Sequence, residues 1–77
     1  MLPFVGLALR VCELMEMHDK ASQQIVMRFC KMYEPEKISR IVEQAKKFVW
    51  WQNNPKAAFM KAVGEVNKQD KTLKERN

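Results

Sequence analysis

The sequence predicts an all-α protein, a small bundle of three to four helices with a charged C-terminal helical extension. Apolar residues recur at helical spacing through most of the chain, whereas β-branched residues form no alternating run of the kind that marks a strand. Only two glycines and three prolines interrupt the 77 residues. A chain of this length forms one domain at most, with a core that is only marginally sufficient for stability. We therefore expect a single helical domain over residues 1–67 and a polar, basic helical extension or tail over residues 68–77.

The composition is that of a folded, basic protein. An apolar share of 47% beside 30% charged residues is typical of a folded chain. Fourteen Lys and Arg residues against nine Asp and Glu residues give a formal charge of +5, which favours nucleic acid, an anionic membrane or an acidic protein surface as a partner. Residues 1–9 are apolar but lack the basic flank of a secretory signal, and charged residues from Arg10 onward interrupt any bilayer span. We expect no membrane span and an intracellular protein, cytoplasmic or nucleoid-associated.

The first predicted helix runs from Pro3 to His18. A proline suits the first turn because its missing N–H would have no intrahelical partner there. Apolar residues cover most of the helix circumference, so it is either the central helix of the domain or part of a subunit interface. In the second case the protein forms a homo-oligomer through Leu7, Val11 and Leu14.

The second and third predicted helices carry one apolar stripe each. Asp19 is placed to cap the second helix, whose stripe is Ala21, Ile25, Phe29, Met32 and Tyr33. Pro35 fits as the first residue of the third helix. The stripe of that helix is Ile38, Ile41, Val42, Ala45, Phe48 and Val49.

The two tryptophans fall outside the stripe of the third helix if that helix continues through them. In that projection Trp51 lies on the side of Arg40 and Lys47, and Lys47 is four residues before Trp51, so its ammonium group can lie over the indole. One indole is then expected at the surface. The alternative is a solvated basic face with both indoles partly buried.

The fourth predicted helix starts after a polar break. Asn54 is placed to cap it and Pro55 to be its first residue. Gly64 inside this helix suggests a helix crossing, because glycine there otherwise costs about 1 kcal/mol relative to alanine. Its buried face is predicted to contain Phe59, Ala62, Val63 and Val66.

The sequence contains no motif for catalysis, metal binding or cofactor binding. Cys12, His18 and Cys30 do not have the spacing of metal ligands on one helix, and no glycine-rich phosphate loop is present. Both cysteines fall at apolar positions, so we expect buried thiols rather than a disulfide. We therefore expect a non-enzymatic protein without a cofactor or a metal.

Basic and aromatic residues around the polar break are the candidate binding site. Cations contact nucleic-acid phosphates, and an exposed indole stacks on an unpaired base. Tryptophan and arginine are also preferred anchors in protein interfaces. Further basic residues, Lys68, Lys71, Lys74 and Arg76, follow in the predicted tail. The candidate site residues are Arg40, Lys47, Trp50, Trp51, Lys56 and Lys61.

A family resemblance covers the run from Tyr33 to Lys68, which contains Ile38, Ile41 and Ala45, then Asn54-Pro55, then Phe59, Ala62 and Val63. This run resembles the C-terminal helical segments of DnaD-like bacterial and plasmid replication proteins. In those segments a helix with regular Ile and Ala leads through a short polar loop to a helix that begins with an aromatic. The resemblance implies DNA binding and self-association in replication initiation. This chain departs by placing Trp50 and Trp51 before the loop and by ending in a charged helix, so no DNA-binding residue is carried over.

Two functions are therefore predicted. The first is a nucleic-acid-associated accessory protein of DNA replication or regulation. The alternative is a protein-interaction or regulatory subunit that oligomerises, or docks on a larger partner, through the first helix and the segment around the tryptophans.

Overall fold

The computed structural model describes the backbone of residues 3–76 and the side chains of residues 4–71. These residues form four helices, α1 (Pro3–Leu14), α2 (Lys20–Met32), α3 (Pro35–Lys46) and α4 (Pro55–Arg76), and within them there is no strand. The predicted all-α class is confirmed. The side chains of Lys74 and Arg76, in the predicted basic tail, lie outside the described residues.

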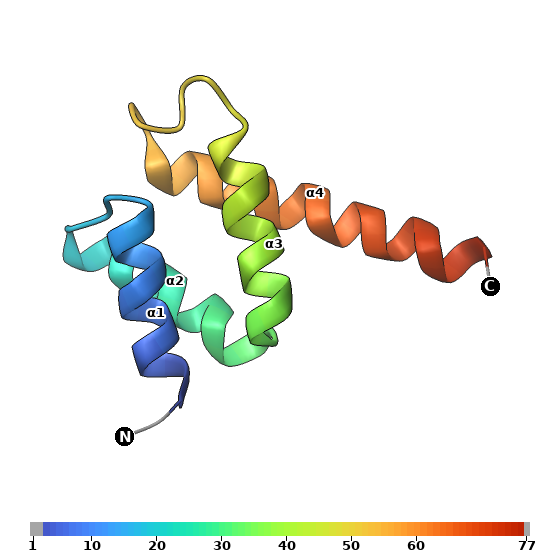
Figure 1. Cartoon of the computed structure of the whole chain (residues 1–77), viewed down its shortest axis with the longest axis horizontal. Coiled ribbons are helices and arrows are strands. Elements are labelled where there is room, and N and C mark those ends of the chain that lie inside the picture. The colour runs from blue at the N-terminus through green and yellow to red at the C-terminus, as the bar shows by residue number, and fades with distance from the viewer. Residues whose placement is uncertain (1–2, 77) are drawn as a thin grey trace.

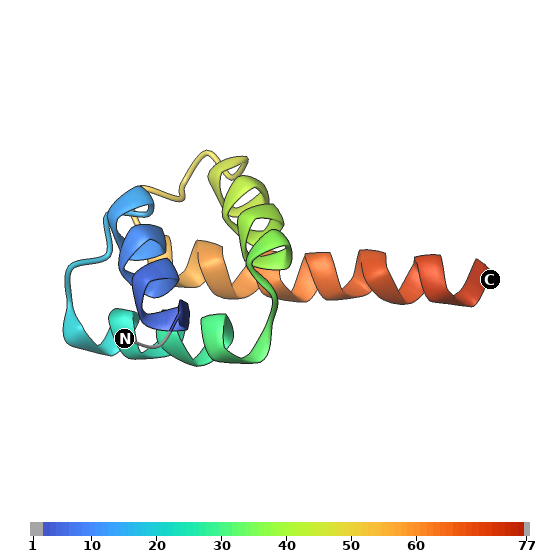
Figure 2. The same ribbon diagram turned by 60° about the horizontal axis from the view of Figure 1, so that its bottom comes forward.

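The helices are arranged as two pairs. α1 packs on α2, and α3 packs across α4, while α2 and α3 meet near the short turn that joins them (Figure 1). The C-terminal end of α4 projects away from the other three helices in both ribbon views (Figure 2). The molecule therefore has a flattened, elongated outline of 39 × 33 × 16 Å.

The predicted helix starts of α2, α3 and α4 are confirmed. The Ser22 N–H donates to Asp19 Oδ2 at 3.0 Å, and the Ala57 N–H donates to Asn54 Oδ1 at 3.2 Å, so both capping side chains satisfy a backbone donor of the first turn. Pro35 and Pro55 are the first residues of α3 and α4. Each of these helix starts depends only on the few residues around it, which explains why the sequence predicts it.

The predicted C-terminal end of the first helix is wrong, because α1 stops at Leu14 and not at His18. The Met17 N–H donates to the Cys12 carbonyl at 2.8 Å and the Glu16 N–H to the Glu13 carbonyl at 3.2 Å. Glu16 has a φ of 55°, the left-handed conformation that a Schellman cap needs at this position. Glycine normally occupies it, so the sequence carries no stop signal.

The core lies where the two helix pairs meet, and the stripes of α3 and α4 are largely as predicted. Gly64 is exposed and a Cβ atom there would meet no other part of the described chain within 4 Å, so it does not mark a helix crossing and that prediction is wrong. The largest fully buried side chains are Phe59, Met15, Ile38, Ile41, Val26 and Val66.

The predicted stripe of α2 is displaced by one residue. Ser22, Val26 and Cys30 are buried, whereas Ala21 is exposed and Met32 is 60% exposed. The buried residues are small, which lets α1 approach closely. The larger rings of the predicted stripe are half-buried at its edge, where Phe29 stacks on Tyr33 at 5.9 Å and meets Phe59 at 5.8 Å between centroids.

Candidate binding site at the corner between α3 and α4

Residues 47–54 connect α3 to α4, and we call this connection the Trp corner. Most of its backbone hydrogen bonds span three residues, such as those from the Phe48 N–H to the Ala45 carbonyl and from the Trp51 N–H to the Phe48 carbonyl, both 3.2 Å. Such bonds wind the chain more tightly than an α-helix. The aromatic and β-branched run from Phe48 to Trp51 has low helix propensity, and Asn54-Pro55 then starts a new helix. The helical projection of the tryptophans from α3 is therefore wrong.

Phe48 and Trp50 form a stacked pair at this corner. Their ring centroids are 5.1 Å apart and their planes differ by 9°. Residues two apart do not face each other on an α-helix, so this pair exists only because α3 has ended. Lys61 of α4 places its Nζ 5.3 Å from the Phe48 centroid and 5.9 Å from the Trp50 centroid. The three side chains join the connection to the helix that follows it.

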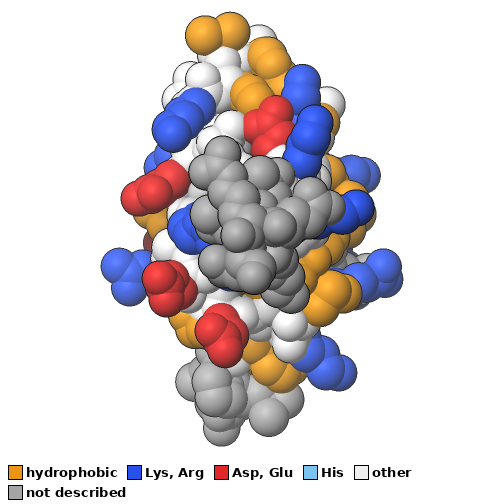
Figure 3. Space-filling model, turned by 90° about the vertical axis from the view of Figure 1, so that its right-hand side faces the viewer, with side chains coloured by type: hydrophobic (Ala, Val, Ile, Leu, Met, Phe, Trp, Pro, Cys, Tyr) orange, Lys and Arg blue, Asp and Glu red, His pale blue; other side chains and the backbone are white. Residues whose placement is uncertain are grey.

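Trp50 and Trp51 are both partly buried against the core, so the expected surface indole is not found and the alternative of two partly buried indoles holds. The cation partner of Trp51 is also not the predicted one. Lys46 Nζ lies 5.4 Å from the Trp51 ring centroid, so the last residue of α3 takes the place expected for Lys47. Lys47 itself is exposed at the end of the helix. Val49, predicted as core, is 98% exposed at the tip of the turn, because the stripe of α3 ends with the helix. Figure 3 shows hydrophobic side chains at the upper tip, where the Trp corner lies in Figure 1, with Lys or Arg side chains on both sides below it and acidic side chains between them.

All charged residues in the segment around the Trp corner are basic. Residues 44–64 contain four lysines, Lys46, Lys47, Lys56 and Lys61, and no Asp or Glu. The acid that follows this segment, Glu65, accepts a hydrogen bond from the Gln44 side-chain amide, which ties α4 to α3. Lys46, Lys47 and Lys61 form no ion pair with a described carboxylate. Their charge is available to an anionic ligand.

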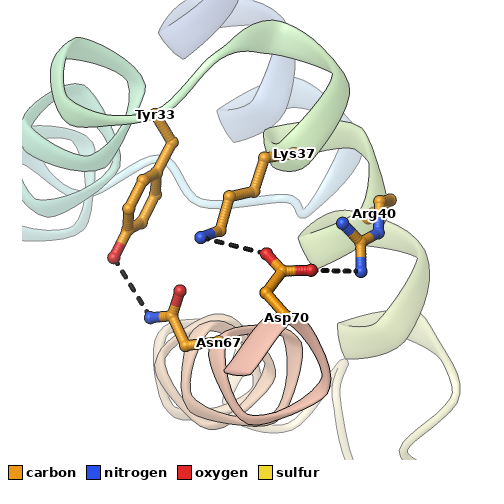
Figure 4. Close-up of polar contacts among 5 residues, drawn as sticks. All are labelled: Tyr33, Lys37, Arg40, Asn67 and Asp70. Atoms are coloured by element: carbon orange, nitrogen blue, oxygen red, sulfur yellow. Dashed lines mark hydrogen bonds and ion pairs between the residues drawn. The ribbon is translucent and has the colours of Figure 1, made fainter. Parts of the chain in front are cut away.

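Arg40 belongs to a different cluster. Its guanidinium lies 3.0 Å from Asp70 Oδ1, and Lys37 Nζ lies 3.2 Å from the other carboxylate oxygen, where α3 crosses the later part of α4 (Figure 4). The hydrogen bond from Arg40 and then that from Lys37 lower the pKa of Asp70 below its usual range. Beside this pair the Asn67 amide donates to the Tyr33 hydroxyl at 3.1 Å. Arg40 thus holds two helices together.

Lys56 also lies apart from the indoles, on the side of the α1–α2 connection. It lines a polar hollow of about 280 Å³ that also includes Glu16, Asp19 and Asn53, and its charge lowers the pKa of Asp19, after the larger effect of the hydrogen bonds from Ser22. Of the six candidate residues, the structure brings Lys61 over Trp50, and Trp51 follows Trp50 in the chain; Lys47 is exposed at the start of the corner, Arg40 pairs with Asp70 and Lys56 faces Asp19.

Sequence reasoning missed Lys46 and the part that Phe48 and Val49 play in the corner. The low helix propensity of four consecutive aromatic or β-branched residues before Gln52 is the signal that would have ended α3 earlier. With the helix ended at Lys46, the stacked pair and the exposed valine follow.

Both cysteines are free and buried, as predicted. Burial, and secondly the neighbouring Cys12, raise the pKa of the Cys30 thiol to about 11, and burial also raises the pKa of Cys12. Within the described residues no three His, Cys, Asp or Glu side chains gather as a metal site requires. No helix among the residues that the structure describes is long and apolar enough to cross a membrane.

No protein-family model matches the sequence, and comparison with curated proteins and with solved structures gave no significant match. The resemblance to DnaD-like segments therefore stays a prediction.

Proposed function

We propose that this protein is a non-enzymatic helical module that binds single-stranded nucleic acid through the Trp corner. The observation that carries the proposal is that Lys46 and Lys61, neither with an ion-pair partner in the described chain, lie over the rings of Trp51 and Trp50, in a segment without Asp or Glu that also contains the exposed Lys47. Single-strand binding by other proteins combines a basic surface with aromatic side chains on which bases stack. The DnaD-like resemblance agrees with a role beside DNA replication or its regulation.

The Trp corner places lysines for phosphate contacts close to the indoles on which bases would stack. Lys46 lies over the indole of Trp51, so a base that stacks on that face takes the place of the ammonium group, which then reaches the adjacent phosphate. Lys61 lies over both rings of the stacked Phe48–Trp50 pair and presents its charge beside them. Stacking on an aromatic side chain contributes about 1–3 kcal/mol per base.

The test is a titration with a fluorescently labelled oligothymidylate and with a duplex of equal length, followed by anisotropy and by tryptophan emission at low and moderate salt. We expect salt-sensitive binding of the single strand, tighter than that of the duplex, with quenching of the indole emission. Absence of salt-sensitive binding to either nucleic acid would refute the proposal. Binding to an acidic polypeptide such as polyglutamate but to neither nucleic acid would also overturn it, in favour of an acidic protein partner.

A matched pair of lysine variants locates the site. Lys61 and Lys31 are both exposed and both lie over a phenylalanine ring, Lys31 Nζ being 6.0 Å from the Phe4 centroid. Lys31 lies in the last turn of α2, next to the start of α3, whereas the Trp corner follows the end of α3, which is about 18 Å long at 1.5 Å per residue. Lys61→Ala is expected to weaken binding several-fold more than Lys31→Ala, although both remove one charge. Trp51→Ala is expected to weaken it about tenfold, as the loss of one stacked base requires.

A further inference from the structure

A second surface, unrelated to the Trp corner, lies between the two helix pairs. A hollow of about 220 Å³ separates α1 from α3 and is lined by apolar residues of both helices. We call it the α1–α3 groove. Its apolar lining consists of Leu7, Val11, Leu14, Ile38 and Val42.

The groove continues along α1 toward the start of the helix. A second hollow of about 200 Å³ is lined by Phe4, Leu7, Cys30 and Pro35, so the two hollows share Leu7. Together they follow α1 from Phe4 to Leu14, a length of about 15 Å at 1.5 Å per residue. Leu14 is 46% exposed although it lines the groove. An apolar trough of this length fits a helix of about three turns, the length of α1 itself.

The rim of the groove carries one charge of each sign. Arg10 stands on the α1 wall and Glu43 on the α3 wall, both exposed, and neither makes an ion pair or a hydrogen bond with another described side chain. A two-fold axis through the groove would place Arg10 of each copy opposite Glu43 of the other copy, giving two Arg10–Glu43 pairs. The surface is therefore complementary to itself in charge.

We infer that the occupant of the α1–α3 groove is a second copy of this chain, so that two α1 helices pack against each other in an isologous dimer. Each α1 lies in the groove of the other copy, covers Leu7 and Leu14, and brings its Arg10 to the other copy's α3 wall. A core of this size is only marginally sufficient, and the dimer adds apolar burial to it. This inference does not depend on nucleic-acid binding, and its test reads a different quantity.

The first test measures the molecular mass by sedimentation velocity from micromolar to millimolar concentration. We expect a concentration-dependent dimer, and a monomer at every concentration would overturn the inference. Leu14→Lys, in the groove, is expected to shift the protein to monomer. Leu9→Lys adds the same charge to the same helix at a leucine that is 57% exposed and does not line the groove, so it should leave the dimer intact. Equal effects of the two variants would also contradict the arrangement.

The second test exchanges the rim charges. Arg10→Glu and Glu43→Arg, each alone, place like charges opposite each other twice per dimer, and each is expected to raise the dimer dissociation constant roughly tenfold. The double variant restores opposite charges and should recover the wild-type constant. Failure of the double variant to recover it, with helical circular dichroism unchanged, would refute the two-fold pairing. The oligothymidylate titration of the same variants shows separately whether the Trp corner is active.

Discussion

The salt dependence of nucleic-acid binding follows from which cations the structure leaves available. Lys46 and Lys61 lie over rings of the Trp corner and Lys47 is exposed at its start, all three without ion-pair partners in the described chain, whereas Arg40 is held by Asp70. Each cation that neutralises a phosphate of a single strand contributes about 0.7 to the slope of log affinity against log salt concentration. Three contacts give a slope of about −2, so affinity should fall about twentyfold between about 50 and 200 mM salt.

Two variants distinguish the lysines without ion-pair partners from Arg40, which is paired with Asp70. Lys61→Ala should reduce the magnitude of the slope by about 0.7. Arg40→Ala should leave the slope unchanged, because its charge already belongs to the Asp70 cluster. The assay is the anisotropy of a labelled oligothymidylate over a series of salt concentrations, with circular dichroism of each variant as the control for folding. An Arg40→Ala variant whose slope falls as much as that of Lys61→Ala would refute this division of the cations.

Three further predictions concern the fold. Glu16→Gly should raise the free energy of unfolding by about 0.5–1 kcal/mol in thermal melts, because it relieves a left-handed φ of 55°, and Glu16→Ala, which removes the same charge but keeps the strain, should give no such gain. Both thiols should resist alkylation at pH 8 in the native protein and react fully in guanidinium, because burial raises their pKa values, to about 11 for Cys30. Mass spectrometry measures the extent of alkylation, and rapid labelling of the native protein would contradict the packing of α1 on α2. Hydrogen bonds, first from Arg40, lower the folded-state pKa of Asp70, so its contribution to stability is present above the unfolded pKa of about 4 and is lost as the pH falls through the folded value. Asp70→Asn should therefore flatten the acid limb of the unfolding free energy below about pH 4, and an unchanged acid limb would show that this ion pair is not formed in solution.

The features that the sequence predicted correctly are those encoded within a few residues. Asp19 and Asn54 cap helices that begin directly after them, and the stripe Ile38, Ile41, Val42 and Ala45 is buried within one regular helix. Each of these needs only local geometry.

The errors come from helix ends without a standard signal and from contacts across the fold. Glu16 ends α1 in a conformation that glycine usually takes, and the early end of α3 changes the direction of every side chain from Phe48 onward. Asp70 lies 30 positions from Arg40 in the sequence, so no local pattern predicts their ion pair, which forms only because α3 crosses α4. The candidate site was thus predicted as a region, and its division into separate clusters was not.

α4 continues beyond its contact with α3 at Asp70 as one unbroken helix. Its 22 residues span about 33 Å at 1.5 Å per residue, from the Trp corner to Arg76, and Asp70 anchors it to α3 part-way along. Each residue inserted beyond Asp70 would lengthen it by about 1.5 Å and turn its far end by about 100° relative to the corner. The length of α4 therefore sets both the separation and the rotation between the Trp corner and the C-terminal end of the helix.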